Sequence, residues 1–326
     1  MGKVINKNIL SQIVKEFGNK KVLVIGDSIL DIYVYGHAIG KSAETPTIVA
    51  REEKTECSFG GASCVVTNLL ELGAQVTFVS VIGEDLAGKY YDEWSHPKLN
   101  FHKIKIANKC TTVKKRFWVD GYKLLQFDQI DNTEIESQVE KEIIAYIEKN
   151  ISSFDLLLLV DYRHGMISNF LAKSINDLSF KFKVPVFASS QVSQRESNHL
   201  NYAGSDYICL NLKEANQVLQ NFNPQQDLTK LSALLNSSIC LTLGNQGAFL
   251  KEKNRETFFV SSIKVEEVDP CSAGDSFLAS FSLSNPLSYP EESLFLANCW
   301  AGLSVTKKGT KPPLKSELNE YISNLK

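Results

Sequence analysis

The sequence has no surplus of basic residues, no long apolar run and no secretory leader pattern. Its 326 residues carry 35 Lys and Arg against 37 Asp and Glu, which gives a formal net charge of −2. This balance argues against a nucleic-acid backbone as the main partner. The longest fully apolar run, residues 156–160, is far too short to cross a bilayer. Residues 1–21 lack the apolar core and cleavage site of a signal peptide, so we expect a cytoplasmic protein with no membrane partner.

Paired cysteine motifs and clustered histidines are also missing. The seven cysteines are an odd number and include no Cys-x-x-Cys. Most lie among apolar or small residues, as Cys209 and Cys240 do, which favours reduced and mainly buried thiols. The five histidines are scattered without ligand spacing, so a zinc site is not expected. No Gly-x-Gly-x-x-Gly occurs, which leaves a dinucleotide-dependent enzyme without support.

Short apolar runs alternate with helical patterns along most of the chain. Buried parallel strands are expected at KVLVIGD, which ends at Asp27, and at residues 156–160, 184–188, 207–210 and 240–244. Helices are expected near residues 62–72, 136–149, 167–181, 213–221 and 227–236. This alternation predicts an α/β fold whose parallel sheet is covered by helices on both faces. Ligands of such sheets bind at the carboxyl ends of the strands, so Asp27, Asp161, Asn211 and Gly244 are candidate site residues.

Two segments have a different pattern, typical of exposed strands. Residues 32–51 combine aromatic and β-branched residues with glycine and proline, and residues 110–127 contain a hairpin signal at Asp120-Gly121. The motif GHAIGKS within the first segment resembles a P-loop but has one residue too few between its glycines. We therefore expect strands here and not a nucleotide-binding loop.

The most informative segment is VDPCSAGDSFLASF, residues 268–281. The small residues Ser272, Ala273 and Gly274 precede Asp275 and an amphipathic helix. A helix N-terminus exposes unpaired N–H groups, and small residues let phosphate oxygens approach them. A carboxylate at the same place can accept a proton from an attacking hydroxyl, which is the pairing that phosphoryl transfer needs. An ordinary capped helix explains the pattern equally well.

A second segment, FGGAS, places Gly60 and Gly61 directly before an expected helix. Paired glycines allow the backbone to approach a ligand closely, or they form a tight turn. On its own this pattern is better explained by the turn.

Taken together, these motifs resemble the ribokinase/pfkB family of carbohydrate kinases. That family has an early Gly-Gly motif and a late Asp-Thr-x-Gly-Ala-Gly-Asp motif, which Gly60-Gly61 and residues 269–275 match in order. The resemblance runs from about residue 21 to the C-terminus. Within the family, segments such as VLVIGDSILDIYVYG and LVDYRHG resemble the kinase module that phosphorylates heptose 7-phosphate at its anomeric hydroxyl.

The resemblance implies a role for each matching residue. Asp275 would be the catalytic base, and the backbone amides of Ser272, Ala273 and Gly274 would form the anion hole. The sugar would be held by Asp31, Gly60, Gly61, Cys64, Arg116 and Asp161. ATP would be held by Asn211, Glu214, Thr242, Gly244, Gly247 and Asn298, with Glu214 acting on Mg²⁺ through water.

The resemblance also implies the overall organisation. Residues 1–326 would form a single three-layer α/β/α domain of the ribokinase-like type, with a small β-sheet lid built from residues 32–51 and 110–127. The lid would also make a homodimer. The substrates would be ATP and a sugar or sugar phosphate, the metal Mg²⁺, and a monovalent cation such as K⁺ is left open.

Three positions depart from the family pattern. Ser272 replaces the first glycine of Gly-Ala-Gly-Asp, Cys64 replaces an asparagine, and Ser189-Ser190-Gln191 replaces an Asp-Pro-Lys. The side chain of Ser272 would crowd a phosphate or require a different backbone. These departures keep two alternatives open. One is a kinase for ribose, a fructose phosphate or a nucleoside, and the other is a sugar-binding or nucleotide-binding protein with weakened catalysis.

Overall fold

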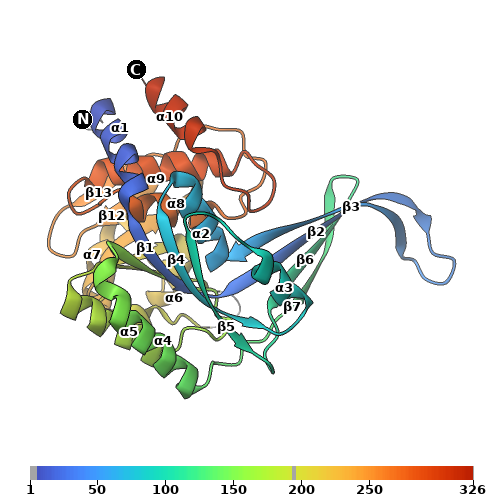
Figure 1. Ribbon diagram of the computed structural model, residues 1–326. Helices are drawn as coiled ribbons and strands as arrows, with labels where there is room; N and C mark the ends of the chain where they lie inside the picture. The colour runs from blue at the N-terminus through green and yellow to red at the C-terminus, as the bar shows by residue number, and fades with distance from the viewer. Residues whose placement is uncertain (1–5, 193–195, 326) are drawn as a thin grey trace.

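A nine-stranded sheet forms the middle layer of the protein (Figure 1). The computed structural model describes residues 6–192 and 196–325, and the strand order is β13-β12-β11-β10-β9-β8-β1-β4-β5. Neighbouring strands are parallel except in the pairs β11–β12 and β12–β13. The strands are β1 (Lys21–Gly26), β4 (Gln75–Gly83), β5 (Leu99–Ile106), β8 (Leu156–Asp161), β9 (Val186–Ser190), β10 (Tyr207–Asn211), β11 (Ser238–Thr242), β12 (Ala248–Lys251) and β13 (Thr257–Val260).

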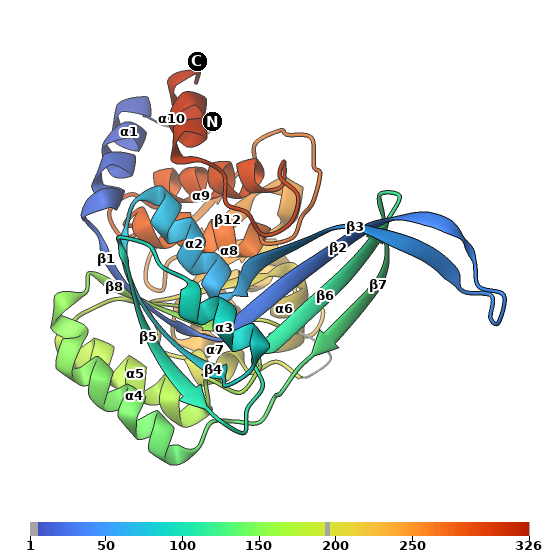
Figure 2. The ribbon, with the colours of Figure 1, turned by 45° about the vertical axis from the view of Figure 1, so that its right-hand side comes forward.

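Helices cover both faces of this sheet, as Figures 1 and 2 show. One face is packed against α1 (Lys7–Glu16), α2 (Ala62–Leu72), α8 (Ala273–Leu283), α9 (Pro290–Ser304) and α10 (Lys315–Ser323). The other is packed against α4 (Ser137–Asn150), α5 (Asn169–Phe182), α6 (Leu212–Val218) and α7 (Pro224–Leu235). Since strand side chains alternate between faces, Val22 and Val24 of β1 join the first core and Leu23 and Ile25 the second.

A second, four-stranded sheet projects from the body with the order β3-β2-β6-β7 (Figure 2). Its strands are β2 (Ser28–Lys41), β3 (Ile48–Gly61), β6 (Thr112–Val119) and β7 (Tyr122–Gln129). The segments expected to form the lid, 32–51 and 110–127, fall within this sheet and its connections. Asp120 and Gly121 both have positive φ, 51° and 84°, as a tight β-hairpin turn requires. Helix α3 (Leu86–Glu93) packs where the lid meets the body.

The sheet and helices expected from the sequence are confirmed, with boundaries shifted by a few residues. The P-loop-like motif GHAIGKS lies mostly in strand β2, as its β-like pattern indicated. Within residues 6–192 and 196–325, no helix combines the length and apolar character needed to span a bilayer. A single residue separates β1 from lid strand β2, so the lid begins directly at the carboxyl edge of the main sheet.

Candidate active site

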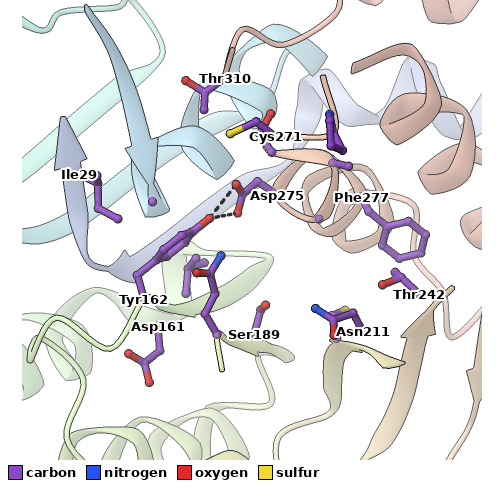
Figure 3. Close-up of a pocket in the computed structure, with 18 of the residues that line it drawn as sticks. Ile29, Asp161, Tyr162, Ser189, Asn211, Thr242, Cys271, Asp275, Phe277 and Thr310 are labelled. Atoms are coloured by element: carbon purple, nitrogen blue, oxygen red, sulfur yellow. Dashed lines mark hydrogen bonds between the residues drawn. The ribbon is translucent and has the colours of Figure 1, made fainter. Parts of the chain in front are cut away.

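A cavity of about 370 Å³ lies between the carboxyl ends of the sheet strands, the lid and the start of α8. Lid strands β2 and β6 contribute Asp31 and Arg116, and the ends of β10 and β11 contribute Asn211 and Thr242. Asp275, in the first turn of α8, lines the same space (Figure 3). Five segments that are distant in the sequence therefore meet at the edge where parallel sheets bind their ligands.

A second cavity of about 390 Å³ adjoins the first, and Thr242, Ala273 and Gly274 line both. Its wall includes Gly244, Gly247 and Asn298. The Asn298 amide nitrogen donates to the carbonyl oxygen of Val260 at 3.0 Å, so this side chain holds the backbone that forms the cavity wall. The residues expected on the nucleotide side thus lie around one elongated space that passes the N-terminus of α8.

The turn before α8 has the backbone conformation that a glycine would adopt. Ser272 has φ +67° and ψ 6°, in the left-handed region. A Cβ atom added at Gly274 would meet open space, so this residue faces the cavity. Asp269 stabilises the turn, because its carboxylate accepts the N–H groups of Cys271 and Gly309, each at 3.0 Å. With Ser272 in this conformation, the start of α8 at Gly274 remains open to the cavity.

The Asp275 carboxylate contacts a residue that the sequence did not single out. The Tyr162 hydroxyl donates to both carboxylate oxygens, at 2.7 and 2.8 Å. Burial raises the pKa of Asp275 to about 7, with hydrogen bonds from Tyr162 and Cys64 opposing the shift. Cys64 lies in helix α2, is fully buried and is not among the residues that line the cavity; its thiol lies 3.7 Å from the Thr310 carbonyl oxygen.

Asp31 and Arg116 form an ion pair on the underside of the lid. The side chains are only 5% and 13% exposed, respectively, and the Arg116 guanidinium also lies 5.2 Å from the centre of the Tyr33 ring. Burial raises the pKa of Asp31, and the neighbouring Arg116 opposes this shift.

The Gly-Gly motif makes room for this ion pair. A Cβ atom on Gly60 would lie 2.1 Å from Asp31 Oδ2, which is far inside contact distance. Gly61 has φ +61° and is the N-cap of helix α2, where its Cβ would lie 2.6 Å from the Asp27 carbonyl oxygen. Gly60 is therefore required by the position of the Asp31 carboxylate, and Gly61 by its positive φ and the close Asp27 backbone.

Asp161 lines the cavity, but its carboxylate is already held by neighbouring side chains. Its carboxylate points away from Asp275 (Figure 3) and accepts hydrogen bonds from Tyr202, Ser190 and Asn198, at 2.8, 3.0 and 2.8 Å. Side chains alternate along β8, so Asp161 shares the side of Leu157 and Leu159, and the next residue, Tyr162, faces α8. This alternation is the signal that could have identified Tyr162.

Asp27 is a second carboxylate near the site, and it forms hydrogen bonds with the backbone of the loop after β8. It accepts backbone N–H groups of Tyr162, His164 and Met166, at 2.8, 3.4 and 3.2 Å. Burial, together with the nearby Asp161, raises the pKa of Asp27 to about 7. Asp27 therefore anchors the backbone that carries Tyr162.

Asn211 and Glu214 cap helix α6 reciprocally. The Asn211 N–H donates to Glu214 Oε2 at 2.8 Å, and the Glu214 N–H donates to Asn211 Oδ1 at 3.0 Å. Burial raises the pKa of Glu214. Across the described residues, no cluster of three or more His, Cys, Asp or Glu is arranged to hold a metal ion directly. Asn211 and Glu214 both line the first cavity as oxygen-bearing side chains.

The Ser189-Ser190-Gln191 departure lies partly on the cavity wall. Ser189 and Gln191 line the cavity, and Ser190 points to Asp161. Lys114 and Arg116 are the basic side chains among the described lining residues, and Arg116 is paired with Asp31. Lys114 lies with its Nζ 5.6 Å from the centre of the Tyr162 ring.

Curated proteins match most of this chain in sequence. Proteins called "Bifunctional protein HldE" from Nitratiruptor sp. and Aliarcobacter butzleri are 29% and 30% identical over 94% and 93% of this chain. The chain spans only 66% and 64% of the length of these two relatives.

Solved structures share the fold at lower sequence identity. Arabidopsis thaliana ribokinase, solved with ribose and ATP, has a TM-score of 0.71 and 20% identity, covering 94% of this chain and 99% of that one. Giardia lamblia ribokinase has a TM-score of 0.73 and 16% identity, covering 93% and 98%. The fold is therefore the three-layer ribokinase-like one with its β lid. The family model described as "pfkB family carbohydrate kinase" matches residues 19–317, and the chain belongs to this family of carbohydrate kinases.

Proposed function

We propose that this carbohydrate kinase transfers the γ-phosphate of ATP to a sugar hydroxyl, with Asp275 as the catalytic base. The observation that carries the proposal is the position of its carboxylate, at the N-terminus of α8 where two adjoining cavities meet. The helix start supplies N–H groups for the phosphoryl oxygens, and Asp275 accepts the proton of the attacking hydroxyl.

ATP would lie along the second cavity, against Thr242, Gly244, Gly247 and the backbone held by Asn298. ATP as the phosphate donor is supported by two solved structures of the same fold, Arabidopsis thaliana ribokinase with ribose and ATP and a putative ribokinase II from E. coli with ATP and Mg²⁺. Mg²⁺ would neutralise the developing charge on the β- and γ-phosphates, with Glu214 contacting its water shell. Whether a monovalent cation such as K⁺ is a further cofactor is left open.

Heptose 7-phosphate is the acceptor that we favour, phosphorylated at its anomeric hydroxyl. Support comes from the HldE relatives and from Lys114, a cation on the sugar side of the cavity. The test is a panel of acceptors supplied with ATP and Mg²⁺ and followed by ADP release. The panel contains heptose 7-phosphate, ribose, fructose 6-phosphate and adenosine. We expect the highest kcat/KM for the heptose phosphate.

A neutral sugar is the second candidate, and one observation favours it. Ser189 and Gln191 stand where the heptose-kinase pattern has an acid and a base, and Asp31 neutralises Arg116. A phosphate dianion would then rely on Lys114. Higher kcat/KM for ribose than for any phosphorylated acceptor would establish this candidate. Tight sugar binding in calorimetry with no phosphorylated product would instead identify a binding protein that has lost catalysis.

The activity should depend on pH through Asp275. The base must be ionised to accept a proton, and its pKa is raised to about 7. We therefore expect kcat/KM to rise about tenfold per pH unit below 7 and to level off above it. Initial rates between pH 5.5 and 8.5, with ADP release followed at subsaturating acceptor, measure this profile. A flat profile over that range would contradict the assignment of Asp275 as the base.

We further propose that the protein is a cytoplasmic homodimer joined through the lid. All seven cysteines are free thiols, which suits a reducing compartment. On β7, Leu125 and Phe127 are 55% and 68% exposed, and they lie on the face of the lid opposite the side chain of Arg116. Apolar side chains exposed at this density on a projecting sheet mark a surface that a partner covers.

Replacing both Leu125 and Phe127 by Lys should convert the dimer to a monomer, because charges would be buried at the contact. Light scattering coupled to size exclusion measures the mass. Phe180→Lys is the matched control, since Phe180 is 89% exposed on α5, away from the lid. A wild-type chain that elutes with the mass of one subunit at micromolar concentration would disprove the dimer.

A further inference from the structure

The Tyr162 hydroxyl occupies the position that an acceptor hydroxyl needs. It donates to both oxygens of Asp275, at 2.7 and 2.8 Å, inside the cavity assigned to the sugar. A substrate hydroxyl activated by Asp275 has to make the same contact, at the same carboxylate. Figure 3 shows these two hydrogen bonds, and an acceptor hydroxyl that bound to Asp275 would have to take the place of the Tyr162 hydroxyl.

The backbone at Tyr162 is anchored, and its ring is partly buried against the core beneath α8. Its backbone N–H donates to Asp27 at 2.8 Å, so the main chain stays in place when the side chain rotates. The ring packs beneath the Lys114 ammonium, 5.6 Å away, and it is held at its tip by the Asp275 hydrogen bonds. Burial keeps the phenol protonated by raising its pKa well above the usual value, so it remains a hydrogen-bond donor to the carboxylate.

We propose that Tyr162 shields Asp275 from water while the sugar side is empty, and that the incoming acceptor displaces its hydroxyl. This inference rests on the proposed role of Asp275. Without a shield, Asp275 could take a proton from water. The water oxygen would then form a bond to the γ-phosphorus, the bond from that phosphorus to the β–γ bridging oxygen would break, and ADP and phosphate would leave. Such hydrolysis wastes ATP.

The first experiment measures phosphate and ADP release from ATP and Mg²⁺ with no acceptor present. We expect Tyr162→Ala to hydrolyse ATP at least about tenfold faster than the wild type, because the carboxylate becomes open to water. Tyr162→Phe keeps the ring and should show a smaller increase. Tyr146→Phe, on α4 and stacked on His102, is the matched control and should match the wild type. Equal hydrolysis in the Tyr162→Ala and wild-type proteins would overturn the shield.

The second experiment measures acceptor affinity. In the closed state the Tyr162 hydroxyl is bonded to Asp275, and in the open state it has left. If only a fraction of the molecules is open, the apparent affinity for the acceptor is reduced by that fraction. Tyr162→Phe removes the bonds that favour the closed state, so KM for heptose 7-phosphate, or for ribose if it is the better acceptor, should fall several-fold. A higher KM would mean that the hydroxyl contacts the sugar and would overturn the shield. So would mass spectrometry that finds Tyr162 phosphorylated after incubation with ATP, since the residue would then be an acceptor.

Two further variants separate this inference from the proposed function. Tyr162→Ala combined with Asp275→Asn should lose the extra hydrolysis, because the base is gone. If Asp275→Asn alone still phosphorylates the sugar, the role of Asp275 fails. If Asp275→Asn is inactive but both Tyr162 variants match the wild type in hydrolysis and KM, only the shield fails.

Discussion

Asp275→Asn should lower sugar phosphorylation by about 10²–10⁴-fold and leave ATP binding nearly unchanged. The amide has the shape of the carboxylate and can accept the Tyr162 hydrogen bond, but it cannot take the acceptor proton. The nucleotide cavity is lined by other residues, of which Thr242, Gly244 and Gly247 keep their positions. Single-turnover phosphorylation and calorimetric titration with an ATP analogue measure the two effects.

The same replacement should stabilise the fold at high pH. The folded-state pKa of Asp275 is about 7, above the unfolded value of 3.8, so the stabilisation from its bound proton is lost as the pH rises through 7. Asparagine carries no such charge. The stability of the variant relative to the wild type should therefore increase by about 2–3 kcal/mol between pH 5 and pH 8. Urea unfolding at the two pH values measures this difference.

Asp206→Asn is the matched control for both measurements. Desolvation also raises the pKa of Asp206, but this residue lies at the opposite edge of the sheet, where its carboxylate accepts the Val186 N–H at 2.8 Å. This variant should keep its kinase activity. Normal turnover in Asp275→Asn would exclude Asp275 as the base, and loss of ATP binding would show that the change had damaged the whole site.

Arg116→Met should destabilise the protein by about 3–5 kcal/mol, because it leaves the Asp31 carboxylate buried without its partner. Removal of the guanidinium also takes away the interaction that opposes the raised pKa of Asp31. The loss should therefore be larger at pH 8 than at pH 5, where the unpaired carboxyl binds a proton. Denaturant unfolding at both pH values measures it.

The double variant Asp31→Asn with Arg116→Met should recover much of this stability, since neither charge then remains. It should not recover sugar phosphorylation, because both polar groups of the sugar side are changed. Lys115→Met is the matched control. Lys115 is the neighbouring basic residue on β6, and it lies over the Phe117 ring on the other face of the lid. If Arg116→Met lowers the free energy of unfolding by less than about 1 kcal/mol, Asp31 has found another partner.

The sequence predicted the site best where the signal is local. The ends of β10 and β11 carry Asn211 and Thr242 because a buried apolar run stops there, and the helix start at Ala273 follows from small residues before an apolar stripe. The pair Gly60-Gly61 was recognisable in the sequence, but the requirement for glycine at residue 60 comes from a contact with a distant segment. Only the structure shows that a Cβ at Gly60 would collide with Asp31.

Contacts between distant segments could not be predicted in this way. Tyr162 and Asp275 are separated by 113 positions, and their hydrogen bonds exist only because the loop after β8 faces the start of α8. Asp161 was correctly placed at a strand end, but its direction depends on the pleat of β8 and on the hydroxyl of Tyr202, which comes from another segment. Residue type and position thus gave the candidates, and the alternation of strand side chains decided between them.

The left-handed serine before α8 has a consequence for how the nucleotide binds. A residue with a Cβ costs about 1–2 kcal/mol in this conformation, so the rest of the fold must hold Ser272 there before any ligand arrives. The Asp269 carboxylate, joined to Cys271 and Gly309, supplies part of that restraint. If this turn binds the phosphates of ATP as we propose, it is preorganised for them, and little of the affinity for ATP would be spent on ordering the loop.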